Sequence, residues 1–142
     1  MLKLSLVTPS KKLVTDLSVD EVFLPSYKGE INVLSGHGPL MSTLSTGVLK
    51  YRKSGEEKFE FFSISWGYLE ISGDRVTVLA ETAESALEID LERAREAKAK
   101  AETALSRTDT EQKEFQKNLL KLERAMIRIQ IAGKDEKNQT TH

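Results

Sequence analysis

The chain has 142 residues, a formal net charge of -1 and no cysteine. This length suits one compact domain with an appendage, and the near-zero charge excludes a chain whose overall field attracts nucleic acid or anionic lipid. The absence of cysteine excludes a disulfide framework and cysteine-ligated metals, and it suits a reducing cytoplasm.

The N-terminal segment has neither the apolar core of a signal peptide nor the pattern of a transit peptide. No apolar run approaches the roughly 18 to 20 residues that are needed to span a bilayer. We therefore expect a soluble chain with no direct membrane insertion. If it works at a membrane, another protein must hold it there.

Aromatic and charged residues are distributed unevenly along the chain. Of the nine aromatic residues only Phe115 lies after residue 70, whereas charged residues number 20 in positions 1–84 and 23 in the 58 that follow. Only the first part can therefore bury a true aromatic and aliphatic core. The distribution predicts a β-sandwich domain at residues 1–84, a helical hairpin domain at 85–133 and a disordered polar tail at 134–142.

Short strand-like runs fill the first part of the chain, separated by turns that contain Gly, Pro, Asp or Ser. They are residues 2–7, 12–17, 19–24, 30–34, 41–44, 47–53, 57–64, 67–71 and 75–81. Evenly spaced short strands of this kind are typical of an antiparallel sandwich or flattened barrel. The predicted fold class is α+β, with an antiparallel β-sandwich followed by an antiparallel two-helix hairpin.

After residue 89 the apolar period becomes helical. A seam of small residues is followed by a seam of bulky ones, namely Ala94, Ala97, Ala101 and Ala104, then Phe115, Leu119, Leu122, Met126 and Ile129. A small seam facing a bulky seam predicts close packing of two antiparallel helices. Between the seams, Thr108 and Glu111 fit a capping box for the second helix.

Ile127 and Ile131 lie outside the bulky seam and need a further surface to cover them. Two surfaces fit, the chain's own sandwich and a partner protein. A weakly anchored hairpin with such a choice is a candidate moving part.

Residues for catalysis are missing. His37 is the one internal histidine and His142 is terminal, so neither a histidine-based triad nor a multi-histidine metal site can be assembled. No phosphate-loop motif is present, and aromatic residues do not alternate with the lysines of the second helix as they do in single-strand nucleic-acid binders. The sequence predicts no catalytic and no metal site.

The hairpin does offer one constellation of charges. If the chain turns near residue 108, facing residues have numbers that sum to about 217, so Arg93 faces Arg124 and Asp90 faces Arg128. Facing arginines are unfavourable unless an anion lies between them, and their planar forks match phosphate oxygens. Alternatively, Asp90 caps the first helix and pairs with an arginine. The residues alone leave both interpretations open.

In the order of its motifs the chain resembles the epsilon subunit of bacterial F-type ATP synthase. The matching pieces span nearly the whole length and include LVTP at 6–9, GE at 29–30, GH at 36–37, VTVLA at 76–80, AE at 83–84, IDLERA at 89–94 and ERAMIRI at 123–129. It departs from the family's usual pattern at Ser35, Trp66 and Lys100, and the bulky Trp66 implies altered packing or an extra contact.

The resemblance implies a sandwich of about ten strands and a non-catalytic subunit of the central stalk. Such a subunit binds the gamma subunit, rests on the ring of c subunits and couples proton-driven rotation to ATP synthesis. Its hairpin can extend toward the alpha/beta catalytic head and inhibit hydrolysis. The implied location is peripheral, on the cytoplasmic face of the bacterial inner membrane.

The resemblance also implies site residues. No cofactor is required, but ATP is a candidate regulatory ligand of the residues that match the family's nucleotide motif and its neighbours, namely Glu84, Ile89, Asp90, Arg93, Ala94, Arg124 and Arg128. Glu30 and His37 match loops that the family turns toward the c ring and gamma.

Two other classes remain as alternatives. One is a free-standing binding module whose hairpin enters and regulates a larger enzyme. The other is an enzyme in its own right, which the missing nucleophile and base oppose.

Overall fold

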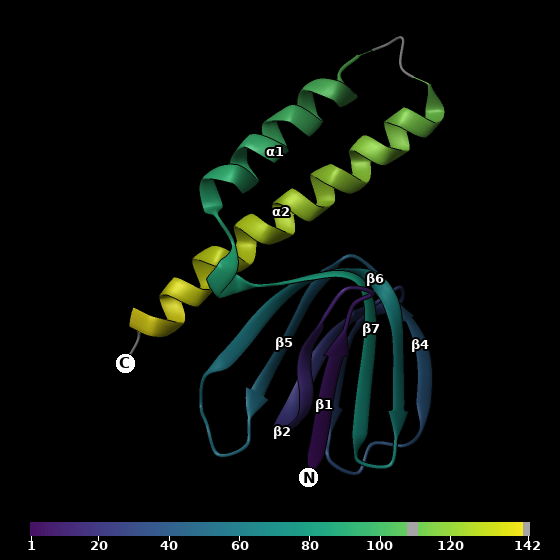
Figure 1. Cartoon of the computed structure of the whole chain (residues 1–142), viewed down its shortest axis with the longest axis vertical. Helices are drawn as coiled ribbons and strands as arrows, with labels where there is room; N and C mark the ends of the chain where they lie inside the picture. The colour runs from purple at the N-terminus through teal and green to yellow at the C-terminus, as the bar shows by residue number, and fades with distance from the viewer. Residues whose placement is uncertain (108–110, 141–142) are drawn as a thin grey trace.

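The computed structural model describes residues 1–107 and 111–140 as a β-sandwich with a helical hairpin at one end (Figure 1). Its elements are β1 (Leu2–Val7), β2 (Lys12–Ser26), β3 (Gly29–Leu34), β4 (Leu40–Leu44), β5 (Gly47–Lys53), β6 (Phe59–Ser72), β7 (Arg75–Ser85), the 3₁₀ turn η1 (Ala86–Glu88), α1 (Leu91–Leu105) and α2 (Gln112–Thr140). The predicted order of a sandwich and then a hairpin is confirmed.

The strands close into a flattened barrel. Antiparallel pairings join β1 to β2, β2 to β5, β5 to β6 and β6 to β7, and a parallel pairing of β7 with β1 completes the circuit. Strand β3 pairs with the second half of β2, and β4 with the second half of β6. The sandwich is therefore antiparallel except at the β1–β7 pair.

The described residues form seven strands, fewer than the nine runs predicted from the sequence and the ten or so that the resemblance implies. The nine runs become seven strands because two pairs of them are single long strands. Runs 12–17 and 19–24 belong to β2, and runs 57–64 and 67–71 belong to β6. Strand β2 bends at Asp16, whose φ is 43°, and its register against β1 shifts on either side of Leu6. A bulge of this kind turns a strand without ending it.

Among the described residues, two apolar clusters hold the molecule together. The larger fills the sandwich with buried Leu, Val and Ile side chains and the stacked rings of Tyr51 and Phe62. The smaller consists of Phe61, Ala86 and Ile131, with partly buried hydrophobic side chains packed around it. Because Ile131 belongs to α2, this second cluster is the junction between hairpin and sandwich.

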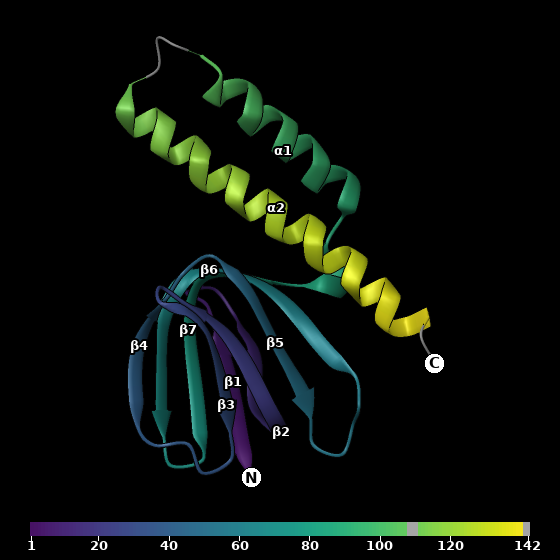
Figure 2. The same cartoon turned by 180° about the vertical axis from the view of Figure 1, so that it is seen from behind.

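The hairpin meets the sandwich through α2, which lies between α1 and the strands (Figures 1 and 2). Helix α2 contacts β5, β6 and η1, and Ile131 is fully buried there. Of the two surfaces that could cover Ile131, the structure shows the chain's own sandwich. Among the described residues, the hydrogen bonds and buried contacts of α2 with the sandwich lie from Arg124 onward, and the first turns of α2 lie farther from the strands (Figures 1 and 2).

The predicted burial of the two helical seams is confirmed for the small residues of α1 but not for the bulky residues of α2. Ala94 and Ala101 of α1 are buried, but Phe115 and Met126 of α2 remain 43% and 51% exposed. Ala125 is the buried residue of this part of α2. Helix α2 packs against α1 on one side and against the sandwich on the other. A small residue is therefore needed where α2 approaches both closely, and its bulky residues lie at the edges of these two contacts.

Boundaries also differ from those expected. Strand β7 continues to Ser85, and α2 runs through to Thr140, so residues 134–140 are helical rather than a disordered tail. Residues 141–142 and the predicted capping residue Thr108 lie outside the described residues.

Candidate functional site

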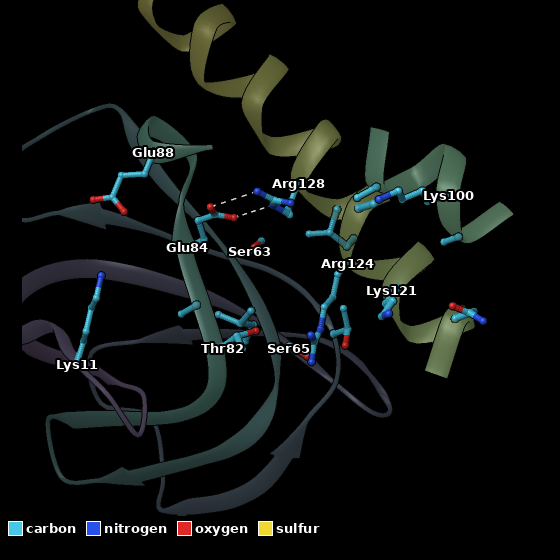
Figure 3. A pocket seen from close by; sticks show the side chains of 18 residues that line it. Lys11, Ser63, Ser65, Thr82, Glu84, Glu88, Lys100, Lys121, Arg124 and Arg128 are labelled. Atoms are coloured by element: carbon cyan, nitrogen blue, oxygen red, sulfur yellow. Dashed lines mark hydrogen bonds and ion pairs between the residues drawn. The ribbon is translucent and has the colours of Figure 1, made fainter. Parts of the chain in front are cut away.

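A solvent-open cavity of about 740 Å³ lies between the end of the sandwich and the hairpin (Figure 3). Strands β6 and β7 form one wall, and α1 and α2 form the other. Its charged lining residues are Lys11, Glu84, Glu88, Lys100, Lys121, Arg124 and Arg128. Five cations and two carboxylates give this cavity a positive balance.

Arg128 of α2 and Glu84 of β7 form an ion pair across the cavity (Figure 3). The Arg128 Nε donates to Glu84 Oε1 at 2.7 Å, and Nη2 donates to Oε2 at 3.4 Å. The two side chains are 25% and 34% exposed, so solvent screens the pair only in part. A two-point pair at a partly exposed site contributes about 1 kcal/mol to holding the hairpin.

Arg124, one turn earlier on α2, makes a second link. Its Nε donates to the hydroxyl of Ser65 in β6 at 3.0 Å. Ser65 is only 1% exposed, and a buried hydroxyl without a partner would cost free energy. Arg124 therefore satisfies a polar group of the sandwich, and its removal would leave that group unpaired.

Glu84→Gln should weaken docking of the hairpin about fivefold, because the loss of the charged pair removes about 1 kcal/mol. The chain has no cysteine, so Ala86→Cys provides a unique thiol at a position that is 6% exposed beneath α2. The rate at which a thiol reagent labels this cysteine reports release of the hairpin. Glu81→Gln, an exposed change on the same strand, is the matched control. Equal labelling rates in Glu84→Gln and the control would show that the ion pair does not hold the hairpin.

The motif residues at the start of α1 lie apart from this cavity. Asp90 is the N-cap of α1, and its Oδ1 accepts a hydrogen bond from the Arg93 backbone N–H at 3.2 Å. Ala94 is buried, Ile89 packs against the junction cluster, and the Arg93 side chain is exposed. None of these four lines the cavity described above.

The seven predicted ligand residues therefore separate into two groups. Glu84, Arg124 and Arg128 come together, whereas Ile89, Asp90, Arg93 and Ala94 do not join them. The expected approach of Asp90 to Arg128 is replaced by the Glu84–Arg128 pair. Asp90 caps α1, as the alternative interpretation predicted. Among the described residues, however, the carboxylate that pairs with Arg128 is Glu84 and not Asp90.

The two residues expected to face the c ring and gamma lie at opposite ends of β3. Glu30 is exposed at its start and lines a separate cavity of about 350 Å³ beside Ile127 and Gln130 of α2. His37 follows the end of β3 in a turn, with Nδ1 2.7 Å from the Gly38 carbonyl oxygen. Glu30 and Leu34 lie about 13 Å apart along β3, and a hydrogen bond from the His37 N–H to the Leu34 carbonyl oxygen keeps His37 beside Leu34. The two residues therefore do not share one contact point.

Several lining residues were not predicted as part of the site. Asn118 and Lys121 precede Arg124 at intervals of three along α2, so helical spacing from the two predicted arginines could have identified them. Ser65 and Thr82 carry no such signal, because their place in the cavity depends on how the hairpin docks. Lys100 was noted in the sequence only as a departure from the family pattern.

Residues 1–86 match the beta-sandwich domain of the ATP synthase delta/epsilon chain, and residues 87–133 match the long alpha-helix domain of the same chain. The chain belongs to the ATP synthase delta/epsilon chain family. The junction of the two matches falls within η1, close to the predicted domain boundary.

Similar proteins support the same family assignment. The chain is 48% identical to the ATP synthase epsilon chain of Geotalea daltonii and 47% identical to that of Geobacter sulfurreducens, in each case over 94% of both chains. The resemblance noted in the sequence is thereby confirmed, and with it the prediction of an ATP synthase subunit.

Solved structures share the fold at low identity. A chain of the Euglena gracilis mitochondrial ATP synthase (OSCP/F1/c-ring) aligns with a TM-score of 0.76 and 22% identity, over 86% of this chain and 75% of that one. A chain of the Tetrahymena thermophila mitochondrial ATP synthase central stalk/c-ring aligns with a TM-score of 0.62 and 11% identity, over 92% and 96%. Within the described residues, no helix has the length and apolar character needed to cross a bilayer.

Proposed function

We propose that this chain is a non-catalytic central-stalk subunit of a proton-translocating ATP synthase and that its hairpin regulates ATP hydrolysis. It binds gamma and the c-subunit ring, and it transmits ring rotation to the catalytic head. Its place is peripheral, on the cytoplasmic face of a bacterial inner membrane. Support comes from the family match over both domains and from a fold shared with chains of mitochondrial ATP synthase assemblies that contain the c-ring.

The single observation that supports a regulatory hairpin best is its small attachment to the sandwich. Among the residues whose side chains the structure describes, α2 contributes one fully buried isoleucine, one ion pair and one arginine–serine hydrogen bond to the junction, beside an open cavity. A junction of few buried contacts can open while each unit stays folded. The released hairpin would then be free to reach the alpha/beta head.

ATP is the proposed regulatory ligand of the docked hairpin. Three of the seven residues that match the family's nucleotide site, Glu84, Arg124 and Arg128, line one cavity. Asp90 and Arg93 would complete the site from the start of α1. A ligand shifts the hairpin toward docking only if it binds the docked state more tightly than the released one.

Co-purification tests the stalk assignment. The chain expressed with its gamma subunit should elute with it in one fixed stoichiometry, because a rotor subunit must hold gamma through many turns. A stable monomer that ignores gamma would contradict the proposal, whatever ligand the hairpin binds.

A further inference from the structure

Two neighbouring cavities share strands β6 and β7 as a wall. The first is the cavity between the end of the sandwich and the helices, and the second is a solvent-open groove of about 620 Å³ beside Trp66. Residues 63–65 of β6 line the hairpin cavity, and residues 66–68 line the groove. Strand β7 makes the same change, from residues 82–84 to residues 79–81. Each strand therefore passes from one cavity to the other between two consecutive residues.

Ser65 and Trp66 are the two residues at this change in β6. Consecutive side chains of a strand point to opposite faces. The Ser65 hydroxyl accepts the hydrogen bond from Arg124 Nε at 3.0 Å, and Ser65 is 1% exposed (Figure 3). Trp66 is 53% exposed, so about half of its surface is covered in the groove. A bond that holds α2 therefore lies one residue from the largest side chain of the groove.

The next residue, Gly67, prevents β6 from absorbing a shift at Trp66. The backbone of β7 approaches so closely there that an added Cβ would clash with the Leu79 carbonyl oxygen. Backbone packed at this density transmits a displacement instead of yielding to it. The peptide unit that joins Ser65 to Trp66 is planar, so the two residues move together. Since lengthening a hydrogen bond by about 0.5 Å weakens it strongly, a small movement of Trp66 is enough to weaken the Arg124–Ser65 bond.

We propose that Trp66 is a positioning residue for the hairpin: its ring, packed in the groove, holds the Ser65 hydroxyl where Arg124 of α2 reaches it. This inference rests on the proposed function in taking docking of the hairpin to be regulated. It adds a part in docking for a side chain that lines the groove and not the hairpin cavity. Because coupling between two sites is reciprocal, release of the hairpin changes the surroundings of Trp66 in turn.

The first test measures labelling of the Ala86→Cys thiol in Trp66→Ala, in Ser65→Ala and in the double variant. Each single change should speed labelling about fivefold to tenfold, since the loss of one hydrogen bond weakens docking by that order. The double variant should label no faster than the faster single variant, because changes that act through one bond are not additive. Trp66→Phe keeps a ring in the groove and should label within about twofold of the parent.

Tyr68→Ala is the matched control. Tyr68 is 64% exposed and lines the same groove from the same face of β6, but Trp66 and Gly67 separate it from Ser65. Its variant should label at the rate of the parent. If Tyr68→Ala speeds labelling as much as Trp66→Ala does, the sandwich loosens as a whole and the inference is wrong.

The second test follows the fluorescence of Trp66, which is the one tryptophan of the chain. Ile131→Ala removes the fully buried side chain of α2 at the junction, and it should shift the Trp66 emission maximum. Met126→Ala changes a residue of the same helix that is 51% exposed, and it should leave the emission maximum unchanged.

Three further results would overturn the inference. The first is a parent rate of labelling in Trp66→Ala. The second is an additive double variant, which would mean that Trp66 acts by a route other than Ser65. The third is unchanged Trp66 emission in an Ile131→Ala chain whose thiol labels rapidly. Co-purification with gamma decides the stalk role separately, so a chain that holds gamma and gives one of these results contradicts this inference alone.

Discussion

Ile131→Ala should release the hairpin from the sandwich while both units remain folded. Ile131 is fully buried against Phe61 and Ala86, and among the described residues it is the α2 side chain of that cluster. Truncating a buried isoleucine to alanine costs about 2–4 kcal/mol through lost burial and the cavity left behind. Docking should therefore weaken by roughly 30-fold to 1000-fold, since about 1.4 kcal/mol corresponds to a factor of ten.

The measurement is the labelling rate of the cysteine in Ala86→Cys, compared with and without Ile131→Ala. Met126→Ala removes a comparable side chain from the same helix, but one that is 51% exposed, so it should label at the rate of the parent. Far-ultraviolet circular dichroism should show the same helix content in the Ala86→Cys parent and in its Ile131→Ala and Met126→Ala variants. Slow labelling in the Ile131→Ala variant would mean that other contacts hold the hairpin.

Gly67→Ala should destabilise the sandwich itself. An added Cβ at Gly67 would clash with the Leu79 carbonyl oxygen and lie 2.8 Å from the Ala80 Cα, both backbone atoms of β7. The hydrogen-bonded backbones of two paired strands cannot move aside as a flexible side chain can. Strands β6 and β7 must therefore separate locally around Gly67. The expected loss is about 3 kcal/mol in the free energy of unfolding, or roughly 10 °C in Tm.

Thermal and denaturant unfolding followed by circular dichroism measure this loss. Gly38→Ala is the matched control, because a Cβ there meets no atom within 4 Å and the backbone is not left-handed. The control should unfold within about 0.5 kcal/mol of the parent, as surface changes usually do. Equal stability of the two variants would show that β6 and β7 do not approach at Gly67 as closely as described.

The sequence was sufficient for the number and order of the units because hydrophobic period and composition both change near residue 89. It was not sufficient for the strand count. The predicted runs break at Ser18 and at Ser65–Trp66, yet β2 continues past a bend at Asp16, and β6 continues through Gly67, where β7 approaches it closely. Glycine and aspartate mark both outcomes, and only the pairing partners distinguish a bend from a break.

The candidate site could likewise be predicted only in part. Helical spacing correctly placed Arg124 and Arg128 on one face of α2. Their partners Ser65 and Glu84 lie 59 and 44 positions away in β6 and β7, so no local pattern could pair them. Which carboxylate meets Arg128 depends on how α2 docks, and the sequence arithmetic treated the hairpin without the sandwich.

The most direct test of a regulatory hairpin is the rate of ATP hydrolysis by the assembled ATP synthase carrying each subunit variant. If a released hairpin inhibits, Ile131→Ala should lower hydrolysis several-fold at low ATP, and Met126→Ala should leave it unchanged. Hydrolysis at the parent rate in a complex whose Ile131→Ala hairpin is shown by labelling to be free would contradict regulation by undocking.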